Sequence, residues 1–408
     1  MGLKTKIIKT GRVLRASAAR TAALLPGSSV HFGPPRREAT TLSVSDRSAL
    51  IRHPLLPART FLRSVPEMAD LPLGQWMRQP RLADIKEVFV AELPQGRYWG
   101  RHHGYVIDRN DTLLTDLSST FTPQGQRHDG LDQLKLPPLR ELRGTVAVIN
   151  TFFADNFHHW LLDTVPRFEW LRRAGWPWSG IDHFIFSNKL LRFHLETLEI
   201  LGIDKSKAIC SHPKLHIRAN LLLVPAQSEP AALPLEYNYT PEGLRFVREM
   251  GLNRNPFLQQ NRPKRILISR ERAQARRIVE AERTNRALFE QGFEKVLLED
   301  HSLQEQAAFF HQADCIVMPT GGNLANLVFC RPGTVVIELF SRNYVPPFTY
   351  ALMDELGLRY YGVVAEKVSR PHPQASDVNE DIDVDPDRLA DIVRQALAKF
   401  KAGRPASS

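Results

Sequence analysis

The sequence predicts an α/β protein in which strands and helices alternate in two domains. The chain has 408 residues, more than one ordinary hydrophobic core holds, and a length of about 100 to 200 residues per domain favours two or three domains. Hydrophobic residues make up 43% of the chain and charged residues 24%, which is typical of a soluble globular protein and excludes collagen, coiled coil and wholesale disorder. Short apolar runs alternate with helical periodicity in two stretches, as in parallel, doubly wound sheets.

Residues 1–64 are predicted to form a basic leader. They hold twelve Lys and Arg residues against two acidic ones, so the leader accounts for the whole net charge of +10. The rest of the chain has equal numbers of basic and acidic residues. Because it has no overall positive field to attract a polyanion, the sequence argues against nucleic acid as a partner.

Residues 1–25 place apolar side chains at helical spacing among Lys and Arg. This pattern predicts a helix lying on an anionic membrane surface; a disordered tail and an organelle transit peptide are the alternatives. No apolar run approaches the roughly 18 residues that span a bilayer, and the apolar region of a secretory signal is not found.

The three cysteines show no CxxC spacing, which argues against disulfides and a zinc cluster. We therefore expect a cytoplasmic protein, attached peripherally to a bacterial inner membrane.

The first predicted α/β domain covers residues 65–252. Short strands with turns come first, over 87–117. Strands and helices then alternate in the order strand 146–149, helix 156–173, strand 184–186, helix 190–201 and strand 221–224.

A second α/β domain is predicted over residues 264–365, after a linker at 253–263 that contains Asn-Pro and Arg-Pro pairs. Its elements are strand 265–269, helix 284–291, strand 295–298, helix 302–313 with a capping box, strand 315–318, a glycine turn, helix 323–329 and strand 335–339. Residues 366–384 form an acidic linker, and 385–403 a final helix that begins with Asp385 as cap and Pro386 at its first position. Two such domains place a ligand at the carboxyl ends of their strands.

The first candidate site is a polar row on the helix at 156–173. Asn156, His159, Asp163 and Arg167 lie at i, i+3, i+7 and i+11. Pro166 disfavours helical geometry at the residue before it, so the row is expected to end there and Arg167 to leave it. The row is either a solvated face with an Asp163–Arg167 ion pair, or a histidine general base that a carboxylate one turn away orients.

The second candidate site follows the strand at 315–318. Gly321 and Gly322 permit close backbone approach, and the helix that starts at Asn323 offers N–H groups to a phosphate. Ser269-Arg270 ends a neighbouring strand and Arg276-Arg277 follows it, so these arginines form a candidate diphosphate clamp. A simple turn that needs glycine is the alternative. Glu338, at the end of its strand, is a candidate for holding ribose hydroxyls, or else a cap or ion-pair residue.

Asp381, Asp383 and Asp385 form two overlapping DxD patterns, a signature that holds a metal and a nucleotide in one class of glycosyltransferases. They lie in the acidic linker before the final helix. Solvation and helix capping explain them there, and the sequence predicts no metal site.

Taken in this order, the segments resemble glycosyltransferase family 61. The stretches that match are 156–163 with Pro166-Arg167, 268–270 with Arg276-Arg277, Glu305-Gln306, 321–326 and 336–339. The resemblance implies a GT-B-like arrangement of two facing Rossmann-type domains, and metal-independent transfer with inversion from a nucleotide sugar, a UDP-sugar, to a glycan or glycolipid in surface polysaccharide synthesis.

The resemblance also implies the roles of the site residues. His159 and Asp163 are the catalytic candidates, and Asn156 and Arg167 bind the acceptor. The donor is held by the second domain through Ser269, Arg270, Arg276, Arg277, Gly321, Gly322, Asn323, Asn326 and Glu338. No further cofactor is implied.

This chain departs from the family pattern at two places. It has Thr320 before its glycine pair, where the family commonly has His, and Glu280-Ala281 where the family commonly has Asn-Glu. Two alternatives therefore stay open: a catalytically lapsed binding or scaffold protein, and a nucleotide-sugar epimerase, which needs no acceptor.

Overall fold

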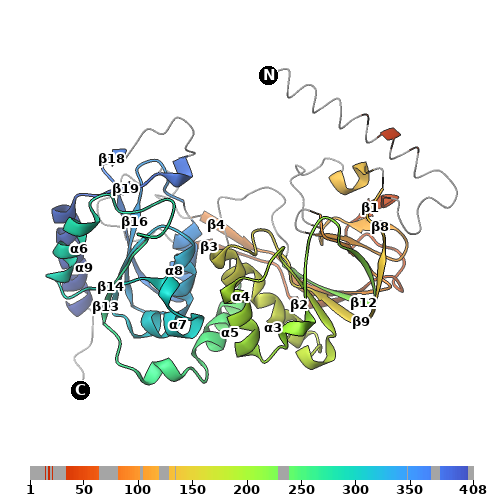
Figure 1. The fold of residues 1–408 in the computed structure, drawn as a ribbon, viewed down its shortest axis with the longest axis horizontal. Helices are drawn as coiled ribbons and strands as arrows, with labels where there is room; N and C mark the ends of the chain where they lie inside the picture. The colour runs from red at the N-terminus through yellow and green to blue at the C-terminus, as the bar shows by residue number, and fades with distance from the viewer. Residues whose placement is uncertain are drawn as a thin grey trace. The chain divides into compact units, whose positions relative to one another are not determined.

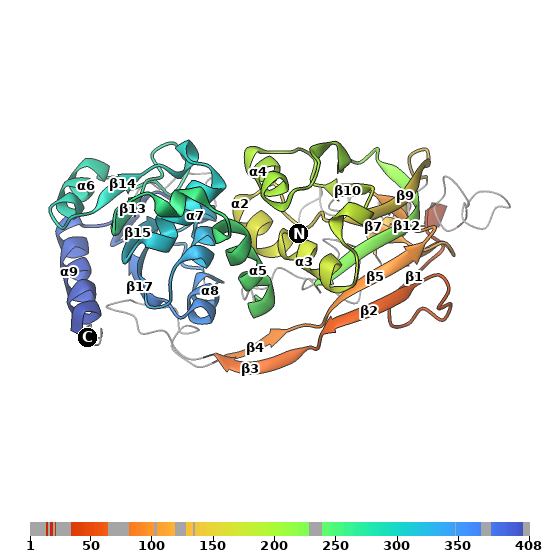
Figure 2. The same ribbon diagram turned by 90° about the horizontal axis from the view of Figure 1, so that it is seen from below.

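A computed structural model describes residues 34–63, 81–101, 104–118, 128–133, 135–227, 239–346, 348–368 and 377–402, together with Leu14, Ser17, Ala18 and Thr21. The chain divides into two compact units (Figures 1 and 2). Unit 1 contains Met1–Arg59 and Lys86–Pro234, and unit 2 contains Thr60–Ile85 and Leu235–Ser408. The membrane helix expected over residues 1–25 lies outside the described residues, apart from the four isolated positions.

Unit 1 is built on a ten-stranded mixed sheet. Its strands are β1 (Arg37–Ala39), β2 (Ile51–Leu56), β5 (Val88–Pro94), β6 (Arg97–Trp99), β7 (Tyr105–Ile107), β8 (Thr112–Leu114), β9 (Arg140–Val148), β10 (His183–Phe186), β11 (Ala208–Cys210) and β12 (His216–Gln227). The run β12-β9-β10-β11 is parallel, as the alternation predicts, but β5 and β6 pair antiparallel with β12. The parallel arrangement predicted for the alternating strands is therefore confirmed, and the short strands that precede them add an antiparallel part to the same sheet.

The second half of the predicted leader is folded. β1 and β2 join the sheet of unit 1, and β3 (Arg59–Arg63) pairs with β4 (Arg81–Ile85). Val44, Ala49 and Leu50 are buried, so this segment contributes residues to the core. The excess of Lys and Arg in its sequence gives no indication of this. The leader thus ends well before residue 64.

The core of unit 1 is formed around the neighbouring strands β9 and β12. Val146, Ala147, Leu222 and Leu223 are all fully buried, because central parallel strands are covered on both faces. Helix α3 (Pro166–Arg173) packs against β5 and β12, and α4 (Arg192–Leu201) precedes β11 in the chain.

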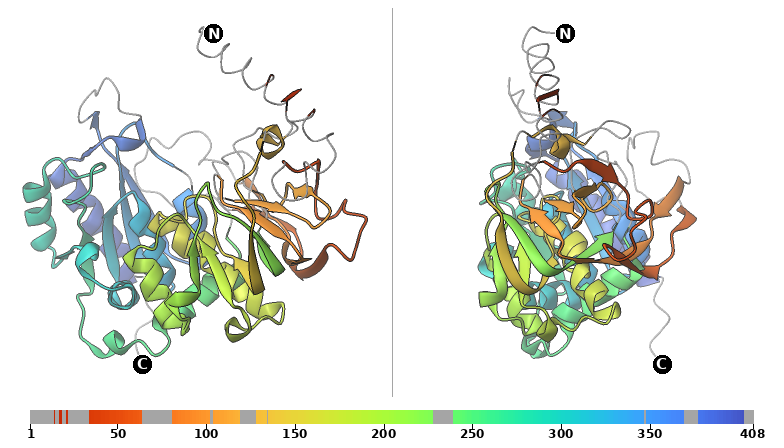
Figure 3. Two further views of the ribbon diagram at one scale, coloured as in Figure 1. Left: turned by 45° about the vertical axis from the view of Figure 1, so that its right-hand side comes forward. Right: turned by 90° about the vertical axis from the view of Figure 1, so that its right-hand side faces the viewer.

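Unit 2 contains a five-stranded parallel sheet in the order β14-β13-β15-β16-β17. The strands are β13 (Arg265–Ile268), β14 (Glu294–Val296), β15 (Cys315–Pro319), β16 (Val335–Phe340) and β17 (Arg359–Val364). Helices α6 (Ala281–Phe289) and α9 (Pro386–Ala402) pack together on one face (Figures 1 and 3). The other face carries α5 (Pro241–Leu252), α7 (Leu303–Gln312), α8 (Phe348–Leu356) and the 3₁₀ helix η8 (Gly322–Phe329) (Figure 2). The alternation predicted for this part of the chain is confirmed.

The segment predicted as a linker, 253–263, lies inside unit 2 and contains the 3₁₀ helix η6 (Pro256–Gln259). Asn255 caps this helix, since its Oδ1 accepts from the N–H of Phe257 at 2.9 Å. Its Nδ2 donates to the carbonyls of Gly251 and Gln304, each at 2.8 Å. Asn255 is therefore packed between α5 and α7. The boundary between the two units in this part of the chain falls after Pro234 instead.

The C-terminal helix begins as predicted. The Asp385 carboxylate accepts from the N–H groups of Asp387 and Arg388, both at 2.9 Å, and α9 starts at Pro386. The acidic segment before it is partly ordered by pairing, because β18 (Lys367–Val368) and β19 (Ile382–Asp383) form an antiparallel pair. In the ranges given above, no helix is both long and apolar enough to cross a bilayer.

Two buried histidines in unit 1 give the fold a pH dependence. Burial lowers the pKa of His158 and of His216 to about 4. Both are neutral in the folded chain, whereas the unfolded chain takes up their protons below about pH 6.5. Stability is therefore fully present above pH 6.5 and is lost as the pH falls from 6.5 towards 4, by up to about 3 kcal/mol for each residue.

His216→Asn tests this dependence. The Nδ1 of His216 donates to the Pro137 carbonyl at 2.9 Å, and an asparagine amide replaces that donor without taking up a proton. We expect the free energy of unfolding, measured in urea between pH 8 and pH 4, to fall less steeply on acidification in the variant. Equal slopes for the two proteins contradict the assignment to His216.

Candidate functional site

The polar row of unit 1 lies on a helix that contains a π turn. The side chain of Asn156 accepts from the N–H of His158 at 2.9 Å, so Asn156 is the N-cap of α2 (Phe157–His159). The π-helical segment η3 (Trp160–Thr164) follows, and the N–H of Val165 reaches the carbonyl of Trp160 at 2.9 Å. The break expected before Pro166 does not occur, because the π turn accommodates a residue without an N–H.

His159 and Asp163 form the contact that their spacing predicts. Nδ1 of His159 lies 2.8 Å from Oδ2 of Asp163, and the two side chains are 18% and 26% exposed. Because the carboxylate accepts, Nδ1 carries the hydrogen and the basic lone pair of the neutral ring lies on Nε2. The pair is thus arranged as a base with an orienting carboxylate.

Arg167 belongs to a buried polar cluster at the carboxyl end of the parallel strands. Its side chain is buried, and Nη1 donates to the carbonyl of Asn150, just past β9, at 3.4 Å. Nδ2 of Asn150 donates to the Tyr98 hydroxyl at 3.1 Å, and that hydroxyl lies 2.8 Å from Oγ of Ser211, just past β11. The Asp163–Arg167 pair considered above is therefore replaced by two separate interactions.

Tyr98, Asn150 and Ser211 were not among the predicted site residues. Asn150 and Ser211 each follow a strand of the parallel run, and this position is the signal that their sequence carries. Asn156 is exposed on the helix end and acts as a cap.

In unit 2, Arg270 lies against the glycine turn. A Cβ on Gly321 would sit 2.4 Å from Nη1 of Arg270 and 3.0 Å from its Cζ, so only glycine leaves room for the guanidinium. Nη2 donates to the Ala275 carbonyl at 3.3 Å. Burial and the neighbouring charge of Arg276 lower the pKa of Arg270.

Arg270 and Arg276 are two neighbouring, half-buried cations, and the carboxylates of Glu299 and Asp381 act on Arg270 electrostatically. The Nε atoms of both are buried and without a hydrogen-bond acceptor. Neither side chain forms an ion pair with a carboxylate of the described ranges. Two like charges that are partly desolvated and form no ion pair are unfavourable, so this place favours an anion.

The structure separates Arg276 from Arg277. Arg276 has a left-handed backbone with φ of 58°, a conformation that costs about 1–2 kcal/mol, and its guanidinium lies 5.6 Å from the centroid of the Tyr344 ring. Arg277 is instead exposed and bound to Asp381, with Nη2 at 2.8 Å from Oδ2 and its own N–H at 2.9 Å from Oδ1. Of the two arginines, Arg276 is the one beside Arg270, and Asp381 of the DxD pattern has an ion-pair role.

The turn itself leads into η8. The N–H of Leu324 is the first to bond backwards, to Gly321 at 3.1 Å, so the N–H groups of Gly322 and Asn323 precede the first helical hydrogen bond. The element is a 3₁₀ helix. Ser269 directly follows β13, and its hydroxyl accepts from the N–H of Glu271 at 3.2 Å, which shapes the turn around Arg270.

Asn326 braces the glycine turn from inside. It is fully buried, and its Nδ2 donates to Oε1 of Gln306 at 3.0 Å. Nε2 of Gln306 donates in turn to the carbonyls of Leu298 and His301, at 2.9 and 3.1 Å. Asn326 therefore positions η8, and its predicted contact with the donor has no support in this geometry.

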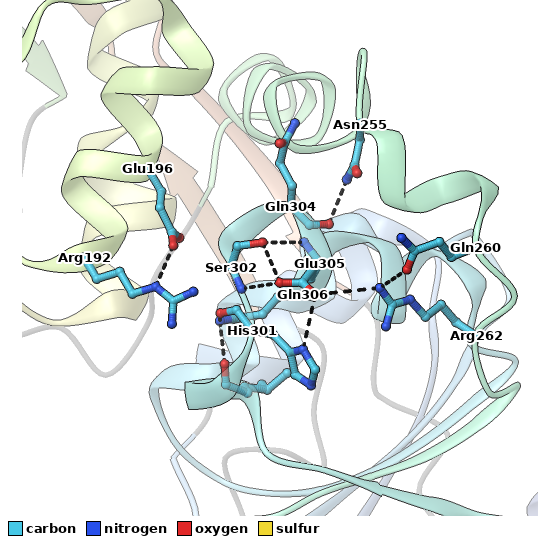
Figure 4. Close-up of polar contacts among 11 residues, drawn as sticks. Arg192, Glu196, Asn255, Gln260, Arg262, His301, Ser302, Gln304, Glu305 and Gln306 are labelled. Atoms are coloured by element: carbon cyan, nitrogen blue, oxygen red, sulfur yellow. Dashed lines mark hydrogen bonds and ion pairs between the residues drawn. The ribbon is translucent and has the colours of Figure 1, made fainter.

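The start of α7 carries the capping box that its sequence predicts (Figure 4). The N–H of Ser302 donates to Oε2 of Glu305 at 2.9 Å, and Oγ of Ser302 accepts from the N–H of Glu305 at 3.3 Å. His301 and Arg262 also approach Glu305, at 3.6 and 3.9 Å (Figure 4). Glu305 is thus a structural residue at the helix terminus.

Glu338 is not at the end of its strand, because β16 continues to Phe340. Its carboxyl is fully buried; it accepts from the Tyr360 hydroxyl at 2.7 Å and from the Thr349 hydroxyl at 3.3 Å. Burial raises its pKa to about 7. With both oxygens bound to hydroxyls of the same unit, Glu338 supports the sheet, and its predicted contact with ribose hydroxyls has no support in this geometry.

The comparison with known families covers both candidate sites. Residues 157–337 match the family model described as Glycosyltransferase 61, and no curated protein matches the chain. The matched segment contains His159, Asp163, Arg270 and Gly321, and it ends just before Glu338. Over this segment, which is less than half of the chain, the match supports assignment to glycosyltransferase family 61 and activity as a glycosyltransferase.

Proposed function

We propose that this glycosyltransferase transfers a sugar, with inversion, from a nucleoside diphosphate sugar to a hydroxyl of a glycan or glycolipid in bacterial surface polysaccharide synthesis. One observation carries the donor half of the proposal. Arg270 and Arg276 lie next to each other by the glycine turn at the carboxyl edge of a parallel sheet, half-buried and without an ion pair to a carboxylate of the described ranges. A diphosphate supplies the negative charge that this place lacks.

Unit 2 binds the donor in this proposal. The N–H groups of Gly322 and Asn323 point from the start of η8, where backbone donors favour a phosphate. The Arg270 and Arg276 guanidinium groups add two positive charges. As the bond between the sugar and the diphosphate breaks, these groups stabilise the negative charge that develops on the leaving oxygen. A UDP-sugar is the proposed donor.

Unit 1 binds the acceptor and supplies the base. Nε2 of His159 takes the proton of the acceptor hydroxyl while that oxygen forms a bond to the anomeric carbon. The bond from this carbon to the diphosphate oxygen breaks on the opposite side, so one displacement inverts the configuration and releases the nucleoside diphosphate. Asp163, 2.8 Å from Nδ1, holds the ring in the required tautomer and stabilises the imidazolium.

We further propose a GT-B arrangement. In it, the two units bring donor and acceptor together. Its support is the parallel sheet of unit 2 and the parallel half of the sheet in unit 1. Residues 1–25 attach the enzyme to an anionic membrane surface. Sedimentation with vesicles that contain anionic lipid tests this attachment, and equal sedimentation after deletion of residues 1–25 contradicts it.

Nucleotide binding followed by product analysis tests the function. We expect UDP and one of a panel of UDP-sugars to raise the melting temperature of the full chain, as a ligand of the folded state does. UDP release that requires an added glycan supports transfer. Conversion of the sugar nucleotide without an acceptor indicates an epimerase, and no shift with any nucleotide indicates a scaffold; either result overturns the proposal.

Gly321→Ala tests the donor site by steric exclusion. The new Cβ meets the Arg270 guanidinium at 2.4 Å, so the side chain must leave its position against the turn. A charge-assisted hydrogen bond contributes about 1.5–3 kcal/mol, so we expect UDP to bind roughly 10- to 100-fold more weakly in calorimetry. Gly180→Ala is the control, since a Cβ there meets only Pro177 at 3.9 Å, and it is expected to bind UDP as the wild type does. Unchanged binding by Gly321→Ala contradicts the site.

A further inference from the structure

The turn between β9 and α2 holds a phenylalanine in an unfavourable backbone conformation. Phe153 has φ of 55°, a left-handed geometry that a bulky side chain rarely adopts. Such residues persist where the surrounding structure fixes them, and they cluster at binding and catalytic sites. The strained conformation therefore indicates that the position of the Phe153 side chain has a function.

Hydrogen bonds to the carbonyls of Phe153 and Ala154 fix the turn. Its carbonyl accepts from the N–H of Asn156 at 2.7 Å. Nε2 of the fully buried His194 lies 2.9 Å from the carbonyl of Ala154, and Nδ1 of the same ring accepts from the N–H of Leu191 at 2.8 Å. Because the backbone N–H must donate to Nδ1, Nε2 carries the hydrogen and donates to Ala154.

The fixed turn presents the Phe153 ring outwards beside the candidate base. The side chain is 38% exposed. Its ring centroid lies 5.3 Å from that of His159, with 40° between the planes, and 5.8 Å from that of Phe152. The strained turn thus holds a partly exposed aromatic side chain next to the His159–Asp163 pair.

We propose that the Phe153 ring is a stacking platform for the acceptor, and that the acceptor sugar is a pyranose with an apolar C–H face. This inference rests on the proposed function and assigns a specificity-determining residue to its acceptor side. The face of an aromatic ring is negative and attracts the weakly positive hydrogens of sugar C–H groups. A sugar that covers Phe153 brings its hydroxyl edge to Nε2 of the adjacent His159.

Phe153 and His159 have complementary roles towards a sugar. The C–H face of a pyranose is held by contact with the ring, while a hydroxyl at its edge requires a polar acceptor for its proton. A ring that is rigidly held loses little conformational freedom on binding. Phe153 therefore orients the acceptor, and His159 acts on it.

Saturation-transfer difference NMR with simple glycosides tests the platform. The full chain is mixed with methyl β-D-glucopyranoside, whose two faces carry axial C–H groups, and with other methyl pyranosides. We expect ring C–H protons to receive saturation in the wild type and in Phe153→Tyr and Phe153→Trp. Phe153→Asn is expected to bind at least about tenfold more weakly with an unchanged or higher melting temperature, since asparagine tolerates the left-handed conformation.

Phe289→Asn, which removes a 47% exposed phenylalanine of unit 2, is the matched control and is expected to bind as the wild type does. The platform is overturned if no methyl pyranoside binds the wild type, if Phe153→Asn binds equally well, or if Phe153→Trp loses binding as Asn does. The shift in melting temperature with UDP is measured on the same samples. UDP stabilisation without glycoside binding refutes the platform alone, and glycoside binding without nucleotide stabilisation supports the platform and refutes the proposed donor.

Discussion

His159→Gln is expected to lower kcat by a factor of about 10² to 10⁴, the usual contribution of a positioned general base. Glutamine keeps a polar group near Asp163 but provides no basic nitrogen for the acceptor proton. The measurement is the initial rate of UDP release with donor and acceptor, while UDP affinity, which depends on unit 2, stays unchanged. His212→Gln, at an exposed histidine of the same unit, is the control and is expected to keep full activity.

The pairing of His159 with Asp163 makes a second measurement decisive. If the carboxylate acts only through the imidazole, the double variant His159→Gln with Asp163→Asn loses little more activity than His159→Gln alone, because residues that act as one unit are not additive. Two losses that multiply show that the residues act independently. That outcome refutes the assignment of Asp163 as the orienting group.

Local patterns of the sequence predict the fold of unit 2 far better than that of unit 1. The strand at 315–318 is a continuous apolar run, and the strand at 335–339 is apolar except for Glu338, because β15 and β16 are covered on both faces. In unit 1, β12 pairs parallel with β9 and antiparallel with β5 and β6. Strand direction depends on these distant pairings, and alternation along the chain does not encode them.

The same limit applies to the sites. His159 and Asp163 are four residues apart, about one helical turn, so their spacing alone predicts the contact. The separation of Arg276 from Arg277 depends on Asp381, which a different segment of the chain brings to Arg277. The sequence predicts Glu338 at a strand end because it does not show that β16 continues to Phe340, nor that Tyr360 lies beside Glu338.

Arg270→Ala is expected to lower kcat by a factor of about 10² to 10³, the loss that follows removal of one preorganised group that stabilises developing charge. The effect falls mainly on kcat, because the charge on the departing diphosphate is larger in the transition state than in the bound donor. Arg270→Lys keeps the charge but not the forked geometry, so we expect it to recover only part of the rate. Initial rates at saturating donor and acceptor measure both effects.

Arg277→Ala is the matched control for Arg270→Ala, since it removes the same type of side chain from the same unit. Its guanidinium is exposed and engaged with Asp381, and an exposed ion pair contributes about 0–1 kcal/mol to stability. We therefore expect Arg277→Ala to lower the melting temperature slightly and to leave kcat near that of the wild type. If the two variants lose activity equally, net positive charge near the donor suffices and the contact of Arg270 with the glycine turn is irrelevant. If Arg277→Ala alone is inactive, the diphosphate binds on the opposite side of the 270–277 loop from the one proposed.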